Sequence, residues 1–150
     1  MYQVAPIIFG DAVDAVTATA STELGTERFV GEKKYRYVYN GGGAVASKWS
    51  PVTVLTAAVG INTITVSTTA GHMVRGVTTV SIPAASYGWV QLQGPVTISC
   101  GSGSSSLDLG AQQVGTDGVI KTHIAAGYPM GNLNTAVVSG NTGLLWLQIP

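Results

Sequence analysis

The sequence is short of charged side chains. Asp, Glu, Lys and Arg together make up 9% of its 150 residues, against roughly 25% in an ordinary soluble domain. Seven acidic residues balance seven basic ones, so the formal net charge is zero. The chain therefore lacks the basic excess that binding to nucleic acid or to an anionic membrane needs, and little electrostatic repulsion opposes its self-association.

The few charges are also unevenly placed. Nine of the fourteen lie between Asp11 and Arg36, whereas the 59 residues from Trp49 to Leu107 contain one, Arg75. A soluble domain normally covers its surface with Lys, Glu, Asp and Arg. A chain that omits them over so long a stretch is expected to hide much of its surface against other proteins, which points to a component of an assembly.

Cysteine and histidine are scarce as well. The single cysteine, Cys100, excludes an intrachain disulfide, which is the usual framework of a small secreted domain. The two histidines, His72 and His123, are far from each other and from Cys100 in the sequence, whereas a zinc site needs several such ligands at close spacing. We therefore expect neither a metal site nor a cofactor.

No catalytic motif is present. The glycines at residues 41–43 lack the lysine and the following helix of a phosphate-binding loop, and residues 101–104 (GSGS) do not match the register of a nucleophile elbow. The remaining alternative, a small hydrolase or lyase that uses Asp108, Asp117 and His123, has no local motif in its support. We therefore expect no catalytic residues and a protein that is not an enzyme.

Long hydrophobic runs are absent too. No apolar stretch reaches the roughly 18 residues that a membrane-spanning helix needs. Residues 1–10 are apolar, but they have no basic region and are followed closely by Asp11 and Asp14, which is unlike a signal peptide. We expect no contact with a membrane, and a protein that stays in the cytoplasm where it is made or in a particle assembled there.

Short stretches with a period of two are the main positive signal. In residues 34–39 (KYRYVY), Tyr35, Tyr37 and Tyr39 share one face of an expected strand. Stretches rich in Val, Ile and Thr predict further strands at residues 26–30, 52–59, 63–68, 74–82, 87–93, 96–100, 119–124, 133–138 and 144–149. So many short strands without a helical period predict a single all-β domain, a small barrel or a sandwich, over residues 23–150. Residues 1–22 have no strong period and are expected to form an extended N-terminal arm.

Aromatic side chains are the candidates for contact with a partner. Trp49 is flanked by polar residues and is expected at the surface, whereas Trp89 and Trp146 lie inside apolar strands and are expected in the core. The tyrosine ladder can bind a ligand or a neighbouring molecule, although it is more typical of one face of a half-buried strand. The surface candidates are Trp49, Tyr35, Tyr37 and Tyr39.

Residues 24–52 (LGTERFVGEKKYRYVYNGGGAVASKWSPV) resemble the opening of the small head decoration, or cement, proteins of tailed bacteriophages. In those proteins a Leu-Gly-Thr start leads through a glycine turn into a Tyr-x-Tyr-Val strand, and a Gly/Ala-rich turn follows. Residues 87–94 (YGWVQLQG) are similar to the middle strand of that family, and residues 145–147 (LWL) are similar to its terminal strand. The resemblance runs from residue 24 towards the end of the chain and does not include residues 1–23.

The resemblance implies a function in a virion. It implies a β-barrel or β-tulip-like body that binds the outer surface of an icosahedral head, often as a homotrimer, and stabilises the shell by bridging neighbouring capsomers. The expected partner is the major capsid protein, and the expected location is the virion surface after assembly in the host cytoplasm. The arm is expected either to lie on the capsid or to cap the protein's own barrel, through its apolar residues Tyr2, Ile7, Ile8 and Phe9.

A second function stays open beside decoration. The chain is also compatible with a carbohydrate- or receptor-binding β-module of a phage head fibre or tail. Trp49 and the tyrosines would then form the binding platform.

Overall fold

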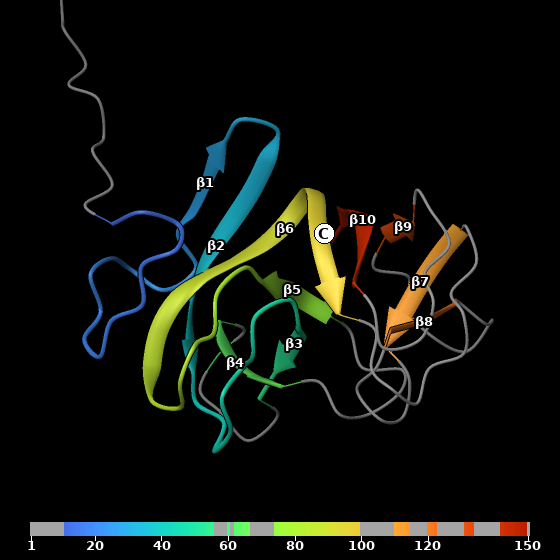
Figure 1. Ribbon diagram of the computed structural model, residues 1–150. Coiled ribbons are helices and arrows are strands. Elements are labelled where there is room, and N and C mark those ends of the chain that lie inside the picture. The colour runs from blue at the N-terminus through green and yellow to red at the C-terminus, as the bar shows by residue number, and fades with distance from the viewer. Residues whose placement is uncertain are drawn as a thin grey trace, which may run out of the picture.

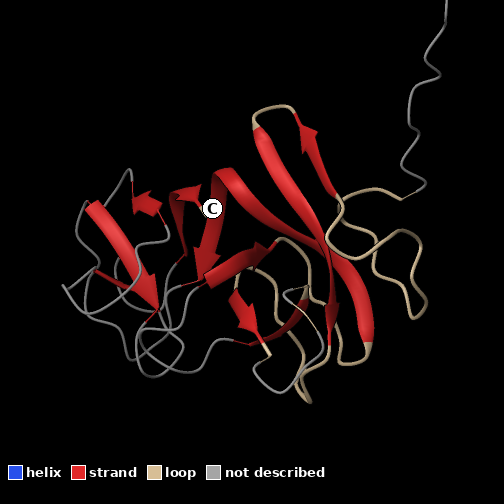
Figure 2. Ribbon diagram, turned by 180° about the vertical axis from the view of Figure 1, so that it is seen from behind, coloured by secondary structure: helices blue, strands red, loops and turns tan. Residues whose placement is uncertain are grey.

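Ten β-strands and no helix make up the part of the chain that the computed structural model describes, residues 11–55, 60, 62–66, 74–99, 110–114, 120–122, 131–133 and 142–149 (Figure 1, Figure 2). The strands are β1 (Glu27–Val30), β2 (Lys33–Asn40), β3 (Pro51–Val54), β4 (Thr63–Val66), β5 (Val74–Thr78), β6 (Ser86–Ser99), β7 (Gly110–Val114), β8 (Ile120–Thr122), β9 (Gly131–Leu133) and β10 (Thr142–Gln148). All ten belong to one hydrogen-bonded sheet, which confirms the prediction of an all-β fold.

Five of the strands close into a barrel. β2 pairs with β4, β4 with β3, β3 with β5 and β5 with β6, and β6 returns to β2. These pairings are antiparallel except for β2–β4, which is parallel. β1 lies on the outer edge of β2, while β10, β9, β7 and β8 continue the sheet from the far half of β6 (Figure 1). The expected small barrel is therefore present, and the sheet extends beyond it on both sides.

β6 joins the barrel to this extension. Its residues up to Gln93 pair with β2, and its residues from Gln93 onward pair with β10. The sequence predicts two strands separated by Gly94 and Pro95, but the structure shows one continuous, curved strand (Figure 1). Gly94 has a φ of 90°, a value that favours glycine, and a Cβ on it would lie 2.7 Å from the carbonyl oxygen of Glu32. The glycine thus changes the direction of the strand without ending it.

The barrel interior holds the main hydrophobic core. Alternate residues of β2 and β6, such as Val38, Val90 and Leu92, contribute to it, as a period of two requires. Leu145 and Leu147 of β10 are fully buried in the same cluster, so the extension shares its core with the barrel. The cluster comprises Val38, Ala46, Val52, Ile64, Val74, Val77, Ile82, Val90, Leu92, Val96, Ile98, Leu145, Leu147 and Ile149.

The second half of the chain departs further from the predicted strands. The sequence does not predict β7, and β9 shares only Leu133 with the strand expected at residues 133–138. Both strands are held by pairing with neighbours, β7 with β9 and β9 with β10, and not by a strong local preference. Several residues discussed above lie outside the described part of the chain, namely His72, Cys100, Asp108, Asp117 and His123.

Candidate interaction surfaces

Tyr35, Tyr37 and Trp89 form a separate buried cluster on the outer side of β2 and β6, opposite the barrel core. Tyr37 and Trp89 are cross-strand partners with ring centroids 5.1 Å apart, and Tyr37 stacks on Tyr87 at 6.1 Å. Tyr39 is half-buried, 4.8 Å from Tyr87. The core position expected for Trp89 is confirmed. Tyr35 and Tyr37 belong to the interior and offer no surface to a partner, which corrects the hypothesis drawn from the sequence.

Residues 11–22 cover this aromatic cluster. Thr17 forms an antiparallel bridge with Tyr87, with N–H···O distances of 3.1 and 2.8 Å. The Tyr37 hydroxyl accepts a hydrogen bond from the backbone N–H of Ser21 at 3.1 Å. The second half of the expected arm therefore lies against the barrel. The four candidates for contact with a capsid lie outside the described residues: Tyr2, Ile7, Ile8 and Phe9.

Arg28 fastens the covering segment to the aromatic cluster. Its guanidinium lies 4.1 Å from the centroid of the Trp89 ring, and its Nη1 donates a hydrogen bond to the carbonyl oxygen of Asp11 at 2.6 Å. Burial lowers the pKa of Arg28 and raises the pKa of the neighbouring Tyr35 hydroxyl. The arginine nevertheless stays charged, because its ordinary pKa lies far above neutrality. Arg28 therefore stabilises the fold through these contacts.

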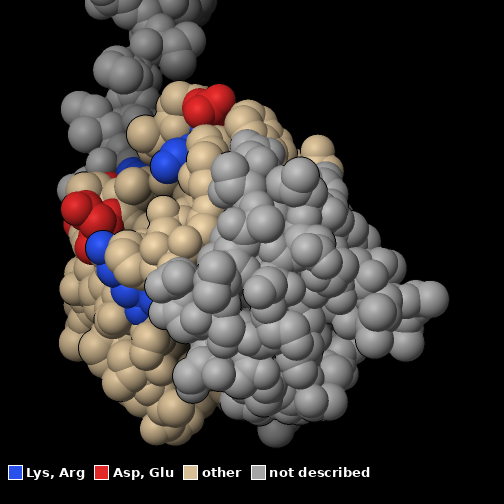
Figure 3. All heavy atoms as spheres, turned by 45° about the vertical axis from the view of Figure 1, so that its right-hand side comes forward, with Lys and Arg blue, Asp and Glu red and all other residues tan. Residues whose placement is uncertain are grey.

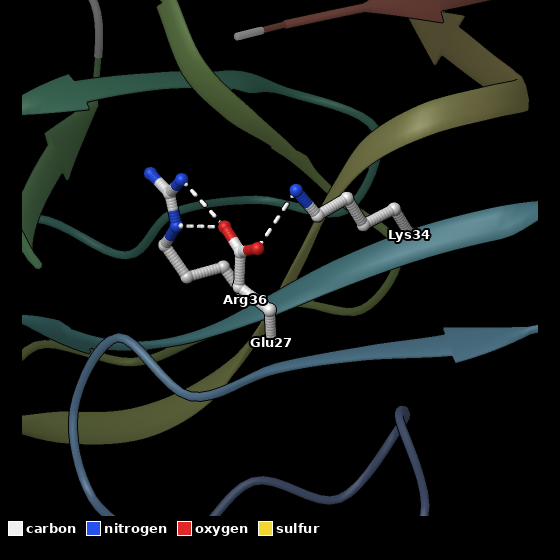
Figure 4. A network of polar contacts seen from close by, with 3 residues as sticks. All are labelled: Glu27, Lys34 and Arg36. Carbon is white, nitrogen blue, oxygen red and sulfur yellow. Dashed lines mark hydrogen bonds and ion pairs between the residues drawn. The ribbon is translucent and has the colours of Figure 1, made fainter.

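Glu27, Lys34 and Arg36 form an ion network on the other face of the β1–β2 hairpin (Figure 4). Glu27 Oε2 is 2.7 Å from Lys34 Nζ, and Glu27 Oε1 accepts hydrogen bonds from Arg36 Nε at 3.0 Å and Nη2 at 2.7 Å. The hydrogen bond from Lys34 holds the pKa of the Glu27 carboxyl below its ordinary value, and Arg36 acts in the same direction against the effect of burial. In Figure 3 the charged side chains gather at one edge of the visible face, with uncharged surface beside them. Glu27 is thus paired with both cations, and the network has one positive charge in excess.

Trp49 remains a candidate for contact with a partner. Its side chain is half-buried, and its backbone has a φ of 66°, which is uncommon for tryptophan. The backbone N–H of Trp49 donates a hydrogen bond to the carbonyl oxygen of Thr78 at 2.7 Å, and Lys48 Nζ lies 4.6 Å from the centroid of the indole ring. The turn holds the ring beside a cation, and a function of Trp49 in binding stays a prediction.

Trp146 is exposed, so the prediction that it lies in the core is wrong. Its side chain is 39% exposed and that of Leu144 is 45% exposed. Both alternate along β10 with the buried Leu145 and Leu147, but all four residues are apolar, so the sequence does not show which face is buried. Trp146 is the cross-strand partner of Pro95 on β6. Together they lie on an open, apolar face of the sheet.

Phe29 is a further exposed side chain, and the sequence did not single it out. It is 68% exposed, more than any other large apolar side chain in the described residues. β1 pairs with β2 on one side, and no described strand pairs with its other edge. The buried position of the neighbouring Arg28 indicates that Phe29 is exposed, because side chains alternate between the two faces of β1.

The fold is similar to that of a known structure from a virus. The N base of head fiber gp8.5 in bacteriophage phi29 aligns with a TM-score of 0.56 and 11% sequence identity, over 76% of this chain and 94% of that chain. At this identity the comparison shows that the two chains share a fold. No protein-family model and no curated protein sequence match the chain.

The described surface carries side chains that suit contact with another molecule more than catalysis or metal binding. Its most prominent side chains are the exposed or half-exposed Phe29, Leu144, Trp146 and Trp49. Within the described residues, no three side chains of His, Cys, Asp or Glu come together in a way that could hold a metal ion. The same part of the chain contains no helix long and apolar enough to cross a membrane.

Proposed function

We propose that this protein is a structural subunit of the head of a tailed bacteriophage and that it decorates the outer surface of the icosahedral shell. The observation that carries the proposal is the similarity of its fold, over 76% of the chain, to the N base of a phage head fiber. The resemblance of residues 24–52 to head decoration proteins supports the same conclusion from the sequence.

Decoration acts by association alone. A packaged head is under internal pressure, and copies that bridge neighbouring capsomers oppose their separation. Each contact can be weak, because multivalent attachment raises the effective strength by roughly 10²–10⁴-fold. A chain with zero net charge suits this function, since identical copies pack together on the shell without repelling one another. The partners in this proposal are the major capsid protein and further copies of the chain, as a homotrimer.

The proposed anchor to the shell is the segment of residues 1–10. The segment can add a short strand to a capsid sheet through its backbone, with its apolar side chains as anchors. Residues 11–22, by contrast, cover the aromatic cluster and are needed by the fold. A chain that starts at Asp11 is therefore expected to fold as the full chain does and to lose its affinity for shells. Full retention of shell binding by this shortened chain would rule out the anchor.

The base of a head fibre is the second candidate function. The comparison favours it, because the similar chain is itself described as the base of such a fiber. The protein would then attach to the shell and serve as the carbohydrate- or receptor-binding β-module of the fibre itself, with Trp49 and the half-buried Tyr39 contributing to the binding platform. Binding of purified protein to a glycan array, lost on substitution Trp49→Ala, would favour this function over decoration.

Cryo-electron microscopy of expanded empty shells mixed with the purified protein tests the proposal. Decoration predicts ordered copies between neighbouring capsomers and shells that disrupt at a higher temperature in calorimetry. A fibre base predicts copies at few positions and no gain in shell stability. The variant Trp49→Ala is the matched control for decoration, because it is expected to bind shells as the unchanged protein does. Shells without any bound copies would contradict both functions.

A further inference from the structure

Two apolar surfaces remain open after the described strands have formed their core. The first, which we name the β1 edge, is the side of β1 that pairs with no other described strand, with Phe29 at 68% exposure. The second, which we name the β10 face, consists of Leu144 and Trp146 on β10 with Pro95 of β6 beside them. Adjacent exposed apolar side chains such as Leu144 and Trp146 are typical of a surface that binds another protein, and an edge strand such as β1 is a place where another chain can attach.

The two surfaces lie on opposite faces of the sheet. Phe29 is the cross-strand partner of Lys34, which shares its face with Val38 of the barrel core. Trp146 points away from that core, because its neighbour Leu145 occupies the core side. β2 and β6 separate β1 from β10 in the sheet (Figure 1). A single copy therefore cannot cover one surface with the other, whereas two copies can.

The charges allow the two surfaces to meet. The described residues at the rim of the β10 face, Thr142, Gln148 and Gln93, are exposed and uncharged. On the face of Phe29, Glu27 pairs with both Lys34 and Arg36 at 2.7 Å, so each of these three charged groups has a partner within the chain. An apolar centre with an uncharged polar rim and a tryptophan in the middle is the usual composition of a protein interface. Contact between copies thus buries no unpaired charge from these residues.

We propose that the β1 edge of one copy docks on the β10 face of the next copy, with Phe29 against Trp146. The contact joins two different surfaces, so it repeats from copy to copy, and it forms a ring where the rotation between successive copies closes. The inference rests on the part of the proposed function in which copies self-associate, and it names the surfaces that do so. Three copies per ring would match the proposed homotrimer.

Sedimentation velocity of the full chain tests this contact with four samples. The unchanged protein is expected to sediment as a closed ring, and Phe29→Ser and Trp146→Ser are each expected to sediment as monomers. An equimolar mixture of the two variants is expected to form a 1:1 dimer, because each variant retains the surface that the other has lost. A single contact lacks the gain from ring closure, so the mixture is measured at about 100-fold higher concentration.

The controls separate the contact from effects on folding. Val45→Ser removes an exposed side chain outside both surfaces and is expected to leave the ring intact. Near-ultraviolet circular dichroism reports whether the buried Trp89 keeps its environment. If a serine variant loses that signal, Phe29→Gln and Leu144→Ser take its place.

Three results would overturn the inference. The first is an unchanged protein that stays monomeric. The second is a Phe29→Ser variant that still assembles while Trp146→Ser does not, which would indicate a two-fold contact between β10 faces. The third is a mixture of the variants that stays monomeric.

Shell binding is measured separately, so the two proposals fail in different ways. Rings that form but do not bind any shell overturn the proposed function and leave the contact in place. Shells decorated by a protein that is monomeric in solution, and decorated equally by both serine variants, overturn the contact and leave decoration in place.

Discussion

Asn40, at the end of β2, holds three backbone segments together from inside the protein. Its side chain is fully buried, and Nδ2 donates to the carbonyl oxygens of Ala44, Ile82 and Pro83 at 3.0, 2.9 and 3.2 Å. Its Oδ1 accepts a hydrogen bond from the Gly42 N–H at 3.2 Å. Buried backbone groups need such partners, because leaving them unpaired costs free energy. A single amide thus fixes how the chain leaves the strand.

Asn40→Asp is expected to lower the free energy of unfolding by about 2–4 kcal/mol. The substitution replaces the donor with a carboxylate oxygen that faces three carbonyl oxygens. Urea denaturation measures the change, and Thr19→Ala, at an exposed position, is expected to change it by less than about 0.5 kcal/mol. Equal stability of the two variants would contradict the function assigned to Asn40.

Gly94→Ala is expected to destabilise the protein by about 1–3 kcal/mol. The new Cβ would lie 2.7 Å from the backbone oxygen of Glu32, at a φ of 90° that side chains avoid. Gly43→Ala is the matched control, because no atom lies within 4 Å of the place that its new methyl group would take. Thermal unfolding of both variants tests the argument, and a Gly94→Ala protein as stable as Gly43→Ala would refute it.

Glu27 makes the stability depend on pH in a defined window. Its pKa is lowered in the folded protein, so the ion network stabilises the fold above the ordinary carboxyl value of 4.5 and this contribution is lost as the pH falls through the lower folded pKa. Glu27→Gln is expected to cost at most about 1 kcal/mol at neutral pH, because the network is partly exposed to solvent. The difference from the unchanged protein should shrink as the pH falls below 4.5.

Denaturant titrations over a series of pH values measure this difference. Glu32→Gln in the adjacent turn is the control, because Glu32 has no ion pair with another described residue. A cost of Glu27→Gln that does not change with pH would show that the carboxylate charge is not its cause.

At the scale of elements, the segment of residues 11–22 covers part of the sheet as an additional layer would, although it forms no strand. It covers the outer face of β2 and β6, where the aromatic cluster would otherwise meet water. Its attachments are the Thr17–Tyr87 bridge, the hydroxyl of Tyr37 and the guanidinium of Arg28. The hydrophobic effect favours this covering, and the polar contacts define its position.

Arg28→Met is expected to loosen the covering segment and to cost about 1–3 kcal/mol of stability. The amides of Thr17 and Tyr87, which bond to each other's carbonyl groups, should then exchange hydrogen faster. Arg36→Met is the matched control, because its guanidinium lies on the opposite face with Glu27. Unchanged exchange at both amides in Arg28→Met would exclude this function of the arginine.

At the scale of the whole molecule, the shortage of charge determines how copies can meet. The β10 face is apolar, and the β1 edge exposes Phe29 beside an ion network whose three charged groups are paired within one chain. Self-association through such surfaces should depend little on salt, because few charges are available to be screened. The protein is thus suited to dense packing on a surface more than to attraction over a distance.

The dissociation constant for self-association is expected to change less than about threefold between roughly 0.05 and 0.5 M sodium chloride. Sedimentation at both salt concentrations measures it. Arg75, the single charge between Trp49 and Leu107, provides the control variant Arg75→Gln, which should behave as the unchanged protein does. A steep loss of association with salt would show that charged contacts hold the copies together.

The pattern of residues alone is enough to predict the class of the fold and most strands of the first half of the chain. Alternation and turn residues act over a few neighbouring positions, so residues 34–39 specify a strand wherever it lies. The sequence does not predict the short strands β7 and β9, because pairing with neighbouring strands holds them in place and not a local preference. The sequence predicts a break at Gly94 where the structure has a bend, because the approach of Glu32 is not a local property.

Which aromatic side chains are buried and which lie at the surface depends on how distant segments pack together. A period of two shows that residues share a face, but it does not show what covers that face. Tyr37 is buried because Thr17 and Ser21 lie over its strand, whereas Trp146 on a similar strand stays exposed. Strand formation is local in the sequence, while burial depends on segments as far apart as Thr17 and Tyr87, and that is why the candidate surfaces emerged from the fold.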